Sequence, residues 1–201
     1  MILRYILVLD FEATCSPTLA RSDMEIIEFP IVVVDMETRT VVAEFHSYVR
    51  ATLHDGLLDP FCTELTGIDQ ETVNGAPDFR TVFADACAFC TSYLARGIFV
   101  TCGDWDLKSM LPTQCARSGL AIPDDFTCWI NIKQAFHAWN GQRPRGMVDM
   151  LSVLGMPLVG RHHSGIDDSR NIAAVAMRML EGGHVFEPTP FKRSGRHPRY
   201  K

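Results

Sequence analysis

Residues 3–10 read LRYILVLD, a run of mostly apolar side chains that ends on an acid. The run is too short to cross a membrane and suits a strand buried in the middle of a sheet. Glu12 follows Asp10 by two positions. Side chains two apart along a strand point to the same face, so both carboxylates are expected together where the strand ends. The alternative is a strand that simply runs into a polar turn.

Further strands and a series of helices are expected along the rest of the chain. A strand at Ile26–Asp35 and another at about 41–49 flank a short turn, which implies an antiparallel hairpin. A buried strand is expected at 97–102. Helical spacing and capping residues predict helices at 60–67, from 69 onward, and at 78–95, 106–118, 132–139, 147–154 and 167–181. Strands followed by alternating helix and strand favour an α/β sandwich with a mixed sheet.

Two more acids are expected to meet the first pair. Asp106 follows the strand 97–102 across a short polar link. If that strand lies beside the first one, Asp106 reaches the sheet edge where open α/β sheets commonly bind ligands. Steps of three and four residues from Asp168 follow the apolar stripe of helix 167–181, so this acid points inward. Asp167 is better interpreted as an exposed cap.

Inward carboxylates at one sheet edge indicate a metal site. Their mutual repulsion costs free energy, and a divalent cation offsets it. Mg²⁺ prefers carboxylates together with phosphate oxygens and water. Several such acids can hold two ions about 4 Å apart and promote hydrolysis of a phosphodiester. His163, five positions before Asp168, is the candidate base for the attacking water because histidine titrates near neutral pH.

The same residues resemble the motifs of the DEDDh exonuclease superfamily. The motifs are DFE (10–12), Asp106, and His163 followed by Asp168. The similarity continues in order through MEIIEFP (24–30), LTGI (65–68), GDWD (103–106), CWIN (128–131) and HSGIDD (163–168). Together these segments are similar to the Eri-type branch, which includes the 3′ histone-mRNA exonuclease, over about residues 4–182.

The resemblance implies an RNase H-like αβα sandwich with a central mixed five-stranded sheet, over an exonuclease domain at 1–185. It implies 3′-to-5′ hydrolysis of RNA, or also of single-stranded DNA, with release of nucleoside 5′-monophosphates. The implied ligands of two Mg²⁺ ions, which Mn²⁺ can replace, are Asp10, Glu12, Asp106 and Asp168. His163 is the implied general base. The third motif carries an extra acid, Asp104, where the family often has another residue.

The resemblance also implies which residues hold the 3′-terminal nucleotide. The expected contacts are main chain at Phe11 and Ala13, the segment containing Leu65, Thr66 and Ile68, and the side chain of Trp105. Stacking of an aromatic ring on a base is worth about 1–3 kcal/mol and tolerates any base. The alternative for Trp105 is packing under the helix that begins at Asp106.

Composition restricts the remaining possibilities. At 201 residues, of which 47% are hydrophobic, the chain suits one domain with a substantial core. A net charge of −5 excludes coating of nucleic acid by charge alone. The basic tail 186–201 either holds phosphates loosely or is a solvated, disordered end. No export signal is evident, so the seven cysteines are expected as reduced thiols in a cytoplasmic protein away from membranes.

Rival interpretations remain at this level. The enzyme could act on DNA, since nothing in the sequence separates ribose from deoxyribose. The chain could be a catalytically inactive nucleic-acid-binding module on the same fold. It could be a zinc protein that uses His162, His163 and scattered cysteines, although the cysteines show no repeated ligand spacing. The choice between monomer and homodimer stays open.

Overall fold

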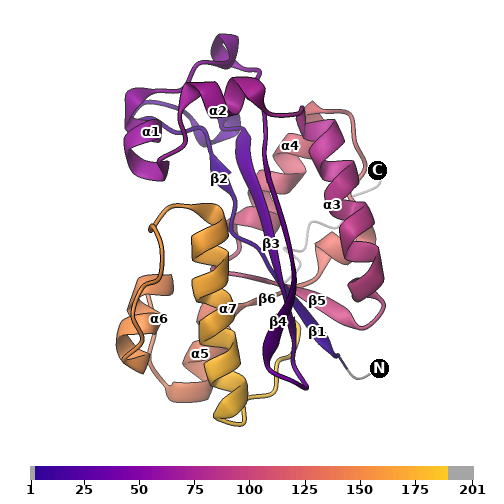
Figure 1. Ribbon diagram of the computed structural model, residues 1–201, viewed down its shortest axis with the longest axis vertical. Coiled ribbons are helices and arrows are strands. Elements are labelled where there is room, and N and C mark those ends of the chain that lie inside the picture. Colours follow the sequence, from indigo (N-terminus) through magenta and orange to yellow (C-terminus); the bar gives the residue numbers. More distant parts are fainter. Residues whose placement is uncertain (1–2, 190–201) are drawn as a thin grey trace, which may run out of the picture.

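Residues 3–189 are described by the computed structural model, and within them six strands form one sheet (Figure 1). The strands are β1 (Tyr5–Val8), β2 (Glu12–Ala13), β3 (Ile26–Asp35), β4 (Thr40–Tyr48), β5 (Gly97–Thr101) and β6 (Trp129–Asn131). The helices are α1 (Pro60–Thr66), α2 (Gln70–Gly75), α3 (Phe79–Leu94), α4 (Leu111–Arg117), α5 (Ile132–Asn140), α6 (Met147–Leu154) and α7 (Gly165–Glu181). A π-helical turn, η3 (Asp106–Met110), leads into α4.

The sheet is mixed, which confirms the predicted class. β3 pairs antiparallel with both β1 and β4, whereas β5 lies parallel to β1 and β6 parallel to β5. The resemblance implied five strands, and the described part of the chain has six because β2 also pairs with β3. The strand pattern of the sequence did not indicate β2 or β6, since two or three residues are too few to show a period.

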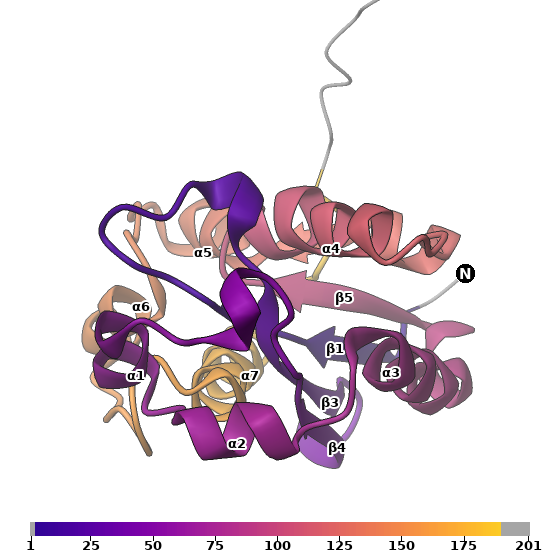
Figure 2. The same cartoon turned by 90° about the horizontal axis from the view of Figure 1, so that it is seen from above.

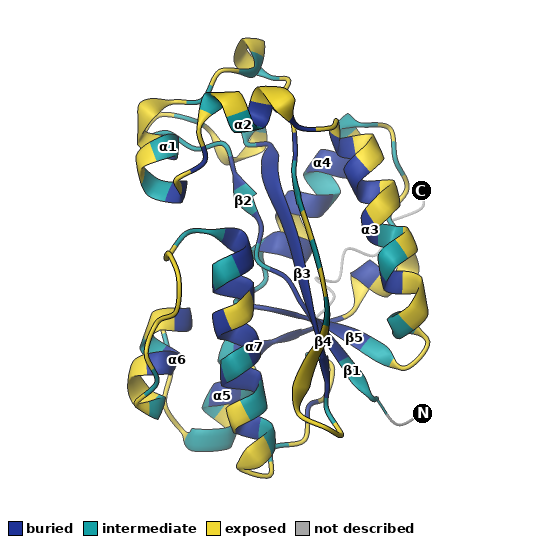
Figure 3. Ribbon diagram, viewed as in Figure 1, coloured by how far each residue is buried: buried dark blue, intermediate teal, exposed yellow. Residues whose placement is uncertain are grey.

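Helices cover both faces of the sheet. Viewed from above, α7 lies on one side of β1 and β3, and α3 lies on the other (Figure 2). Alternate strand residues build the two cores: Leu7 and Phe29 pack on the α3 side, whereas Ile6 and Val32 pack on the α7 side. Every residue of β3 is buried, so this strand crosses the middle of the molecule as an uninterrupted dark ribbon (Figure 3). The two-faced burial explains its continuous apolar run.

The first strand is interrupted at Asp10. β1 and β2 share one register along β3, with Val8 opposite Val32 and Glu12 opposite Glu28. That register would place Asp10 opposite Pro30, which has no N–H to donate. The predicted single strand 3–10 is therefore shorter: Asp10 lies in the break between β1 and β2, and Glu12 begins β2. The interruption leaves the Asp10 main chain free to contact another element.

The packed domain continues beyond residue 185. Phe186 is buried in the core on the α7 side. The Thr189 N–H donates to the Trp129 carbonyl at 2.9 Å, and its hydroxyl accepts from Asn131 N–H at 2.7 Å. Phe186 and Thr189 thus pack on the core and on β6, and the domain bounds stay a prediction. The rest of the expected basic tail, from 190, lies outside the described residues. Within 3–189, no helix combines the length and the apolarity that a membrane crossing requires.

Candidate active site

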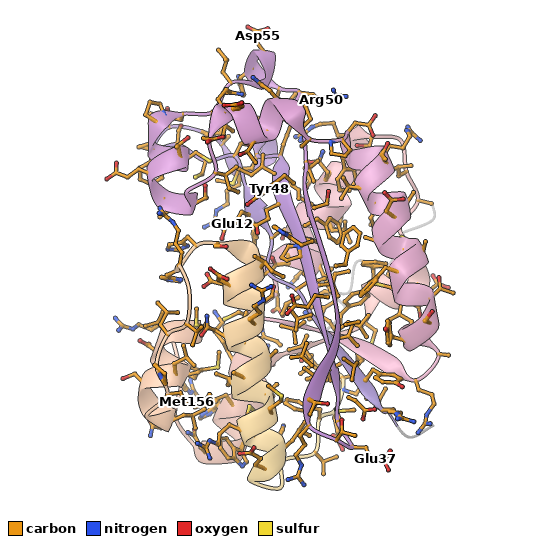
Figure 4. All side chains as sticks on the ribbon, viewed as in Figure 1. Glu12, Glu37, Tyr48, Arg50, Asp55 and Met156 are labelled. Atoms are coloured by element: carbon orange, nitrogen blue, oxygen red, sulfur yellow. The ribbon has the colours of Figure 1, made fainter. Side chains whose placement is uncertain are left out.

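The first three acids lie at one edge of the sheet. β1 and β5 are parallel neighbours, so their carboxyl ends meet, which is the condition under which Asp106 was expected to reach the first two acids. Asp10 follows β1, and Asp106 begins the π-helical turn that follows β5. The Phe11 N–H donates to Asp106 Oδ1 at 2.9 Å and joins the two segments directly. Glu12 lies on β2 near the start of α7 (Figure 4).

The fourth acid comes from the first turn of α7. Asp168 is buried, which confirms that it points inward. Its Oδ2 accepts the His163 N–H at 3.0 Å and lies 3.0 Å from His162 Nδ1. The two histidine rings stack with their centroids 3.9 Å apart. One ligand atom from each of these three residues lies within 4.8 Å of the others, so they form one compact group.

His163 is held in an uncommon backbone conformation. Its φ is 65°, in the left-handed region that few residues other than glycine adopt. Such a conformation persists only where the surroundings impose it, and it is concentrated at functional sites. Here the Asp168 carboxylate accepts the His163 N–H, and α7 begins two residues later. The catalytic candidate is therefore fixed to the same turn as its acidic neighbour.

Burial raises the pKa values of all four acids, and neighbouring negative charges add to that rise at Asp10 and Glu12. Burial, followed by the charges of Asp106 and Glu12, raises the pKa of Asp10 well above its usual value. Burial and then the charge of Glu28 raise the pKa of Glu12 to about 9. Burial raises the pKa of Asp106 to about 6, although the Phe11 N–H opposes that rise. The pKa of Asp168 is also raised, mainly by burial.

This arrangement fits a divalent cation. Four buried or partly buried carboxylates face a common region and repel one another, yet the chain brings them together. Positive charge among them would stabilise their ionised forms. Asp10, Glu12, Asp106 and Asp168 are the residues that would hold it. All four residues converge, together with His163, as the sequence predicted.

The expected nucleotide-binding residues are mostly buried. Phe11, Ala13, Thr66 and Ile68 are each less than 8% exposed, so their side chains are packed inside the domain. The Thr66 hydroxyl donates to the Cys62 carbonyl and accepts from Ile68 N–H, which closes the end of α1. Leu65 is half-buried. Trp105 is also half-buried and packs against the core on the α3 side.

Asp104 does not join the acid group. Its Oδ1 accepts from Asn131 Nδ2 at 2.9 Å and from Trp129 Nε1 at 3.3 Å, so it ties the end of β5 to β6. The zinc interpretation also finds no support. Across residues 3–189, the compact ligand group consists of His162, His163 and Asp168 and contains no cysteine.

Sequence reasoning missed Glu28 and Gly165. Glu28 is a buried acid within the apolar strand β3, and its carboxylate accepts the Gly165 N–H at 2.8 Å. A Cβ on Gly165 would lie 2.6 Å from the Asp10 carbonyl oxygen. The signal in the sequence was the acid inside an apolar run, which always needs a partner.

Gly165→Ala is expected to damage activity, because the added Cβ forces α7 away from Asp10. A displacement of about 1 Å in a catalytic group can cost 100-fold in rate, so a loss of about 10- to 100-fold in kcat is expected, with a lower melting temperature. The matched control is Gly146→Ala, since a Cβ there meets nothing within 4 Å. Steady-state kinetics and thermal unfolding check both variants. Equal activity of the two variants would contradict the close approach.

Fold and site together define an RNase H-like nuclease domain. A family model described as Exonuclease (RNase_T) matches residues 7–176. ERI1 exoribonuclease 3 of Homo sapiens is 44% identical over 191 residues, which cover 92% of this chain and 56% of that protein. The 3′-5′ exonuclease Snipper of Drosophila melanogaster is 34% identical over 204 residues, which cover 92% of this chain and 72% of that protein.

A solved structure gives the same result. The nuclease domain of 3′hExo, a DEDDh family member bound to rAMP, aligns with a TM-score of 0.87 at 35% identity. The alignment covers 94% of this chain and 97% of that one. The chain therefore belongs to the RNase_T exonuclease family, and the resemblance to Eri-type DEDDh exonucleases is confirmed. It spans 56% of the length of ERI1 exoribonuclease 3.

Proposed function

We propose that this protein removes nucleotides one at a time from the 3′ end of single-stranded RNA and releases nucleoside 5′-monophosphates. The observation that carries the proposal is the convergence of four carboxylates and His163 at one edge of the sheet. Similarity to exoribonucleases, and to a nuclease domain bound to an RNA nucleotide, supports RNA as the substrate class.

The four acids are proposed to bind two Mg²⁺ ions, for which Mn²⁺ would substitute. Bound in this way, divalent cations would activate water and stabilise charge on the phosphate and on the leaving oxygen. The acids themselves supply negative charge at fixed positions, and the hydrogen bond from Phe11 N–H keeps Asp106 oriented. His163, two residues before α7, lies beside Asp168 without being buried completely.

A ring nitrogen of His163 is proposed to accept the proton of the attacking water. The water oxygen forms a bond to phosphorus as the bond from phosphorus to the 3′ oxygen breaks, and the leaving oxygen takes a proton from solvent. A base must be neutral to act. Burial and the nearby His162 lower the pKa of His163, so this residue stays neutral at physiological pH.

Leu65, Trp105 and the main chain at Phe11, Ala13, Thr66 and Ile68 are proposed to hold the terminal nucleotide. The exposed residue Gly67 lies between the buried side chains of Thr66 and Ile68, at the end of α1. The backbone there is accessible to a ligand even though the neighbouring side chains are not. Trp105 immediately precedes Asp106, so a base that stacks on its ring would lie close to the acids.

The test is incubation of the purified protein with 5′-labelled single-stranded RNA or matched DNA, with Mg²⁺ or with a chelator. A ladder that shortens from the 3′ end of RNA, only with metal, is expected. Faster cleavage of DNA would change the substrate class. Absence of cleavage together with retained RNA binding would identify a catalytically inactive binding module.

A further inference from the structure

Glu28 is a buried acid that the proposed chemistry does not use. It lies in the third position of β3 and is only 1% exposed. A carboxylate removed from water is costly unless hydrogen bonds or charges compensate it. Its partners therefore indicate why an acid occupies an otherwise apolar strand.

The partners of the Glu28 carboxylate are nitrogen atoms on neighbouring elements. Oε2 accepts the Gly165 N–H at 2.8 Å, and Oε1 accepts the Ile166 N–H at 3.0 Å. His46 Nε2 on β4 lies 2.8 Å from Oε1. The first N–H groups of a helix have no partner within the helix, and a negative charge there is favourable. Ser164, the N-cap of α7, makes no side-chain capping bond, so the carboxylate from β3 takes over that role.

The Glu28 carboxylate also lies close to the part of the acid site that contains Asp10 and Glu12. Glu28 is opposite Glu12 in the pairing of β3 with β2. A Cβ on Gly165 would lie 2.6 Å from the Asp10 carbonyl oxygen and 3.2 Å from the Glu28 carboxyl carbon. The first turn of α7 is therefore in close contact with Glu28 of β3 and with Asp10, which lies between β1 and β2.

The first turn of α7 and the residues just before it carry two of the five site residues. His163 precedes Gly165 by two positions and Asp168 follows it by three, and the two are joined by the hydrogen bond from His163 N–H to Asp168 Oδ2. A shift of the turn would move both residues relative to Asp10 and Glu12. In 3–189, no other side chain is recorded as accepting the Gly165 or Ile166 N–H.

We propose that Glu28 is a positioning residue for the reaction: by capping α7 from β3, it sets the separation between Asp10 and Glu12 on one side and His163 and Asp168 on the other. The inference rests on the proposed function and adds a residue to its machinery. Glu28 acts through α7 and not on the substrate, because N–H groups already occupy its oxygens.

The experiment compares Glu28→Gln with Glu25→Gln. Glu25 is a matched control, because it is also a buried glutamate, 2% exposed, with three hydrogen bonds. Its partners are Thr52 and Leu53, away from α7. In both variants an amide replaces a carboxylate and at least one N–H group loses its acceptor. Similar falls in melting temperature are therefore expected.

Only Glu28→Gln is expected to lower kcat, by about 10- to 100-fold at saturating Mg²⁺, because small displacements of catalytic groups are costly. KM for RNA should change less than about threefold in both variants, since the terminal nucleotide is bound elsewhere. The rise in melting temperature on adding Mg²⁺ should be smaller for Glu28→Gln than for wild type or Glu25→Gln. If both variants keep wild-type kcat and the same Mg²⁺ response, Glu28 is only a structural cap and the inference is overturned.

Two further outcomes stay interpretable. If the wild-type protein hydrolyses no nucleic acid, the proposed function fails, and the Mg²⁺ response of the melting temperature still decides the role of Glu28. If Glu28→Gln does not fold, His46→Ala replaces it, since this change removes one partner of the carboxylate and leaves α7 intact. A loss of kcat in His46→Ala, smaller than about tenfold, supports the positioning role, whereas unchanged kinetics and an unchanged Mg²⁺ response contradict it.

Discussion

Asp10→Ala is expected to reduce RNA hydrolysis at least about a thousandfold while the protein stays folded. The change removes a proposed metal ligand, and metal ions contribute several kcal/mol to stabilisation of phosphoryl transition states. Each tenfold in rate corresponds to about 1.36 kcal/mol, so a loss of about 4 kcal/mol gives this effect. The measurements are the rate of 3′ shortening of labelled RNA and the melting temperature, with and without Mg²⁺.

The Asp10→Ala change should not lower the stability of the metal-free protein, although it lowers the activity. Burial and the neighbouring Asp106 and Glu12 raise the pKa of Asp10. An acid with a raised folded-state pKa contributes stability below its unfolded pKa, and this contribution is lost as pH rises through the folded pKa. Alanine cannot ionise, so the variant does not lose stability in this way as the pH rises. In chelator near neutral pH it should therefore melt at the wild-type temperature or above it. Added Mg²⁺ should then raise its melting temperature less than it raises that of wild type.

Asp78→Ala is a control that should lower the stability and leave the activity unchanged. Asp78 caps α3 by accepting the Thr81 N–H at 2.8 Å, and it lies outside the acid group. Loss of an N-cap typically costs about 0.5–2 kcal/mol of stability. This variant should melt at a lower temperature but retain wild-type kcat. A collapse of the Asp10→Ala fold in chelator would contradict the view that the four acids repel one another in the metal-free protein.

His163→Ala is expected to lower kcat about 10²- to 10⁴-fold, the usual contribution of general acid–base catalysis. KM for RNA should change little, because the side chain is proposed to act on water and not on the nucleotide. The His162→Ala variant is the matched control, since His162 stacks on His163 but is exposed. It should lose less than about tenfold. A larger loss in His162→Ala than in His163→Ala would reverse the assignment of the base.

The pH profile gives an independent check on His163. Burial, followed by the charge of His162, lowers its pKa. A general base acts in its neutral form, so a lowered pKa moves the acidic limb of kcat/KM to lower pH than the usual histidine value of about 6.5. The wild-type enzyme should therefore keep more than half of its maximal kcat/KM at pH 6.5. In His163→Ala this limb should be absent, and an unchanged limb would assign it to another group.

Local pattern was sufficient for several parts of the site. The steps of three and four along α7 predicted that Asp168 points inward, and it is 2% exposed. Counting in the same way from Asp167 gives Asn171, Ala174 and Arg178, a face expected to be mostly solvated, yet Asn171 is buried. Asn171 is buried because its side-chain amide pairs with both the N–H and the carbonyl of Val159. Helical periodicity describes which side of a helix a residue occupies, but not which loop covers that side.

The convergence of the acids depended on an assumption that the sequence could not test. Asp106 reaches Asp10 only because β5 lies parallel beside β1, and strand order is a property of the whole sheet. The family motif GDWD (103–106) is what indicates Asp106 in the sequence. The hydrogen bond from Phe11 N–H to Asp106, across 95 positions, shows how the two segments are joined.

The sequence by itself determined the fold class and the main strands and helices, and it singled out the four acids and His163 as candidates. Each of these depends on periods within one segment or on motifs a few residues long. Only the tertiary structure decided the break at Asp10, the extra strands β2 and β6, the attachment of Asp104 to Asn131, and the partners of Glu28. The sequence shows that an acid inside an apolar strand needs a partner, but Gly165 is 137 positions away. The packing of the whole fold selects that partner. Hydrogen bonds between distant segments follow from this packing, and no periodic pattern in the local sequence shows them.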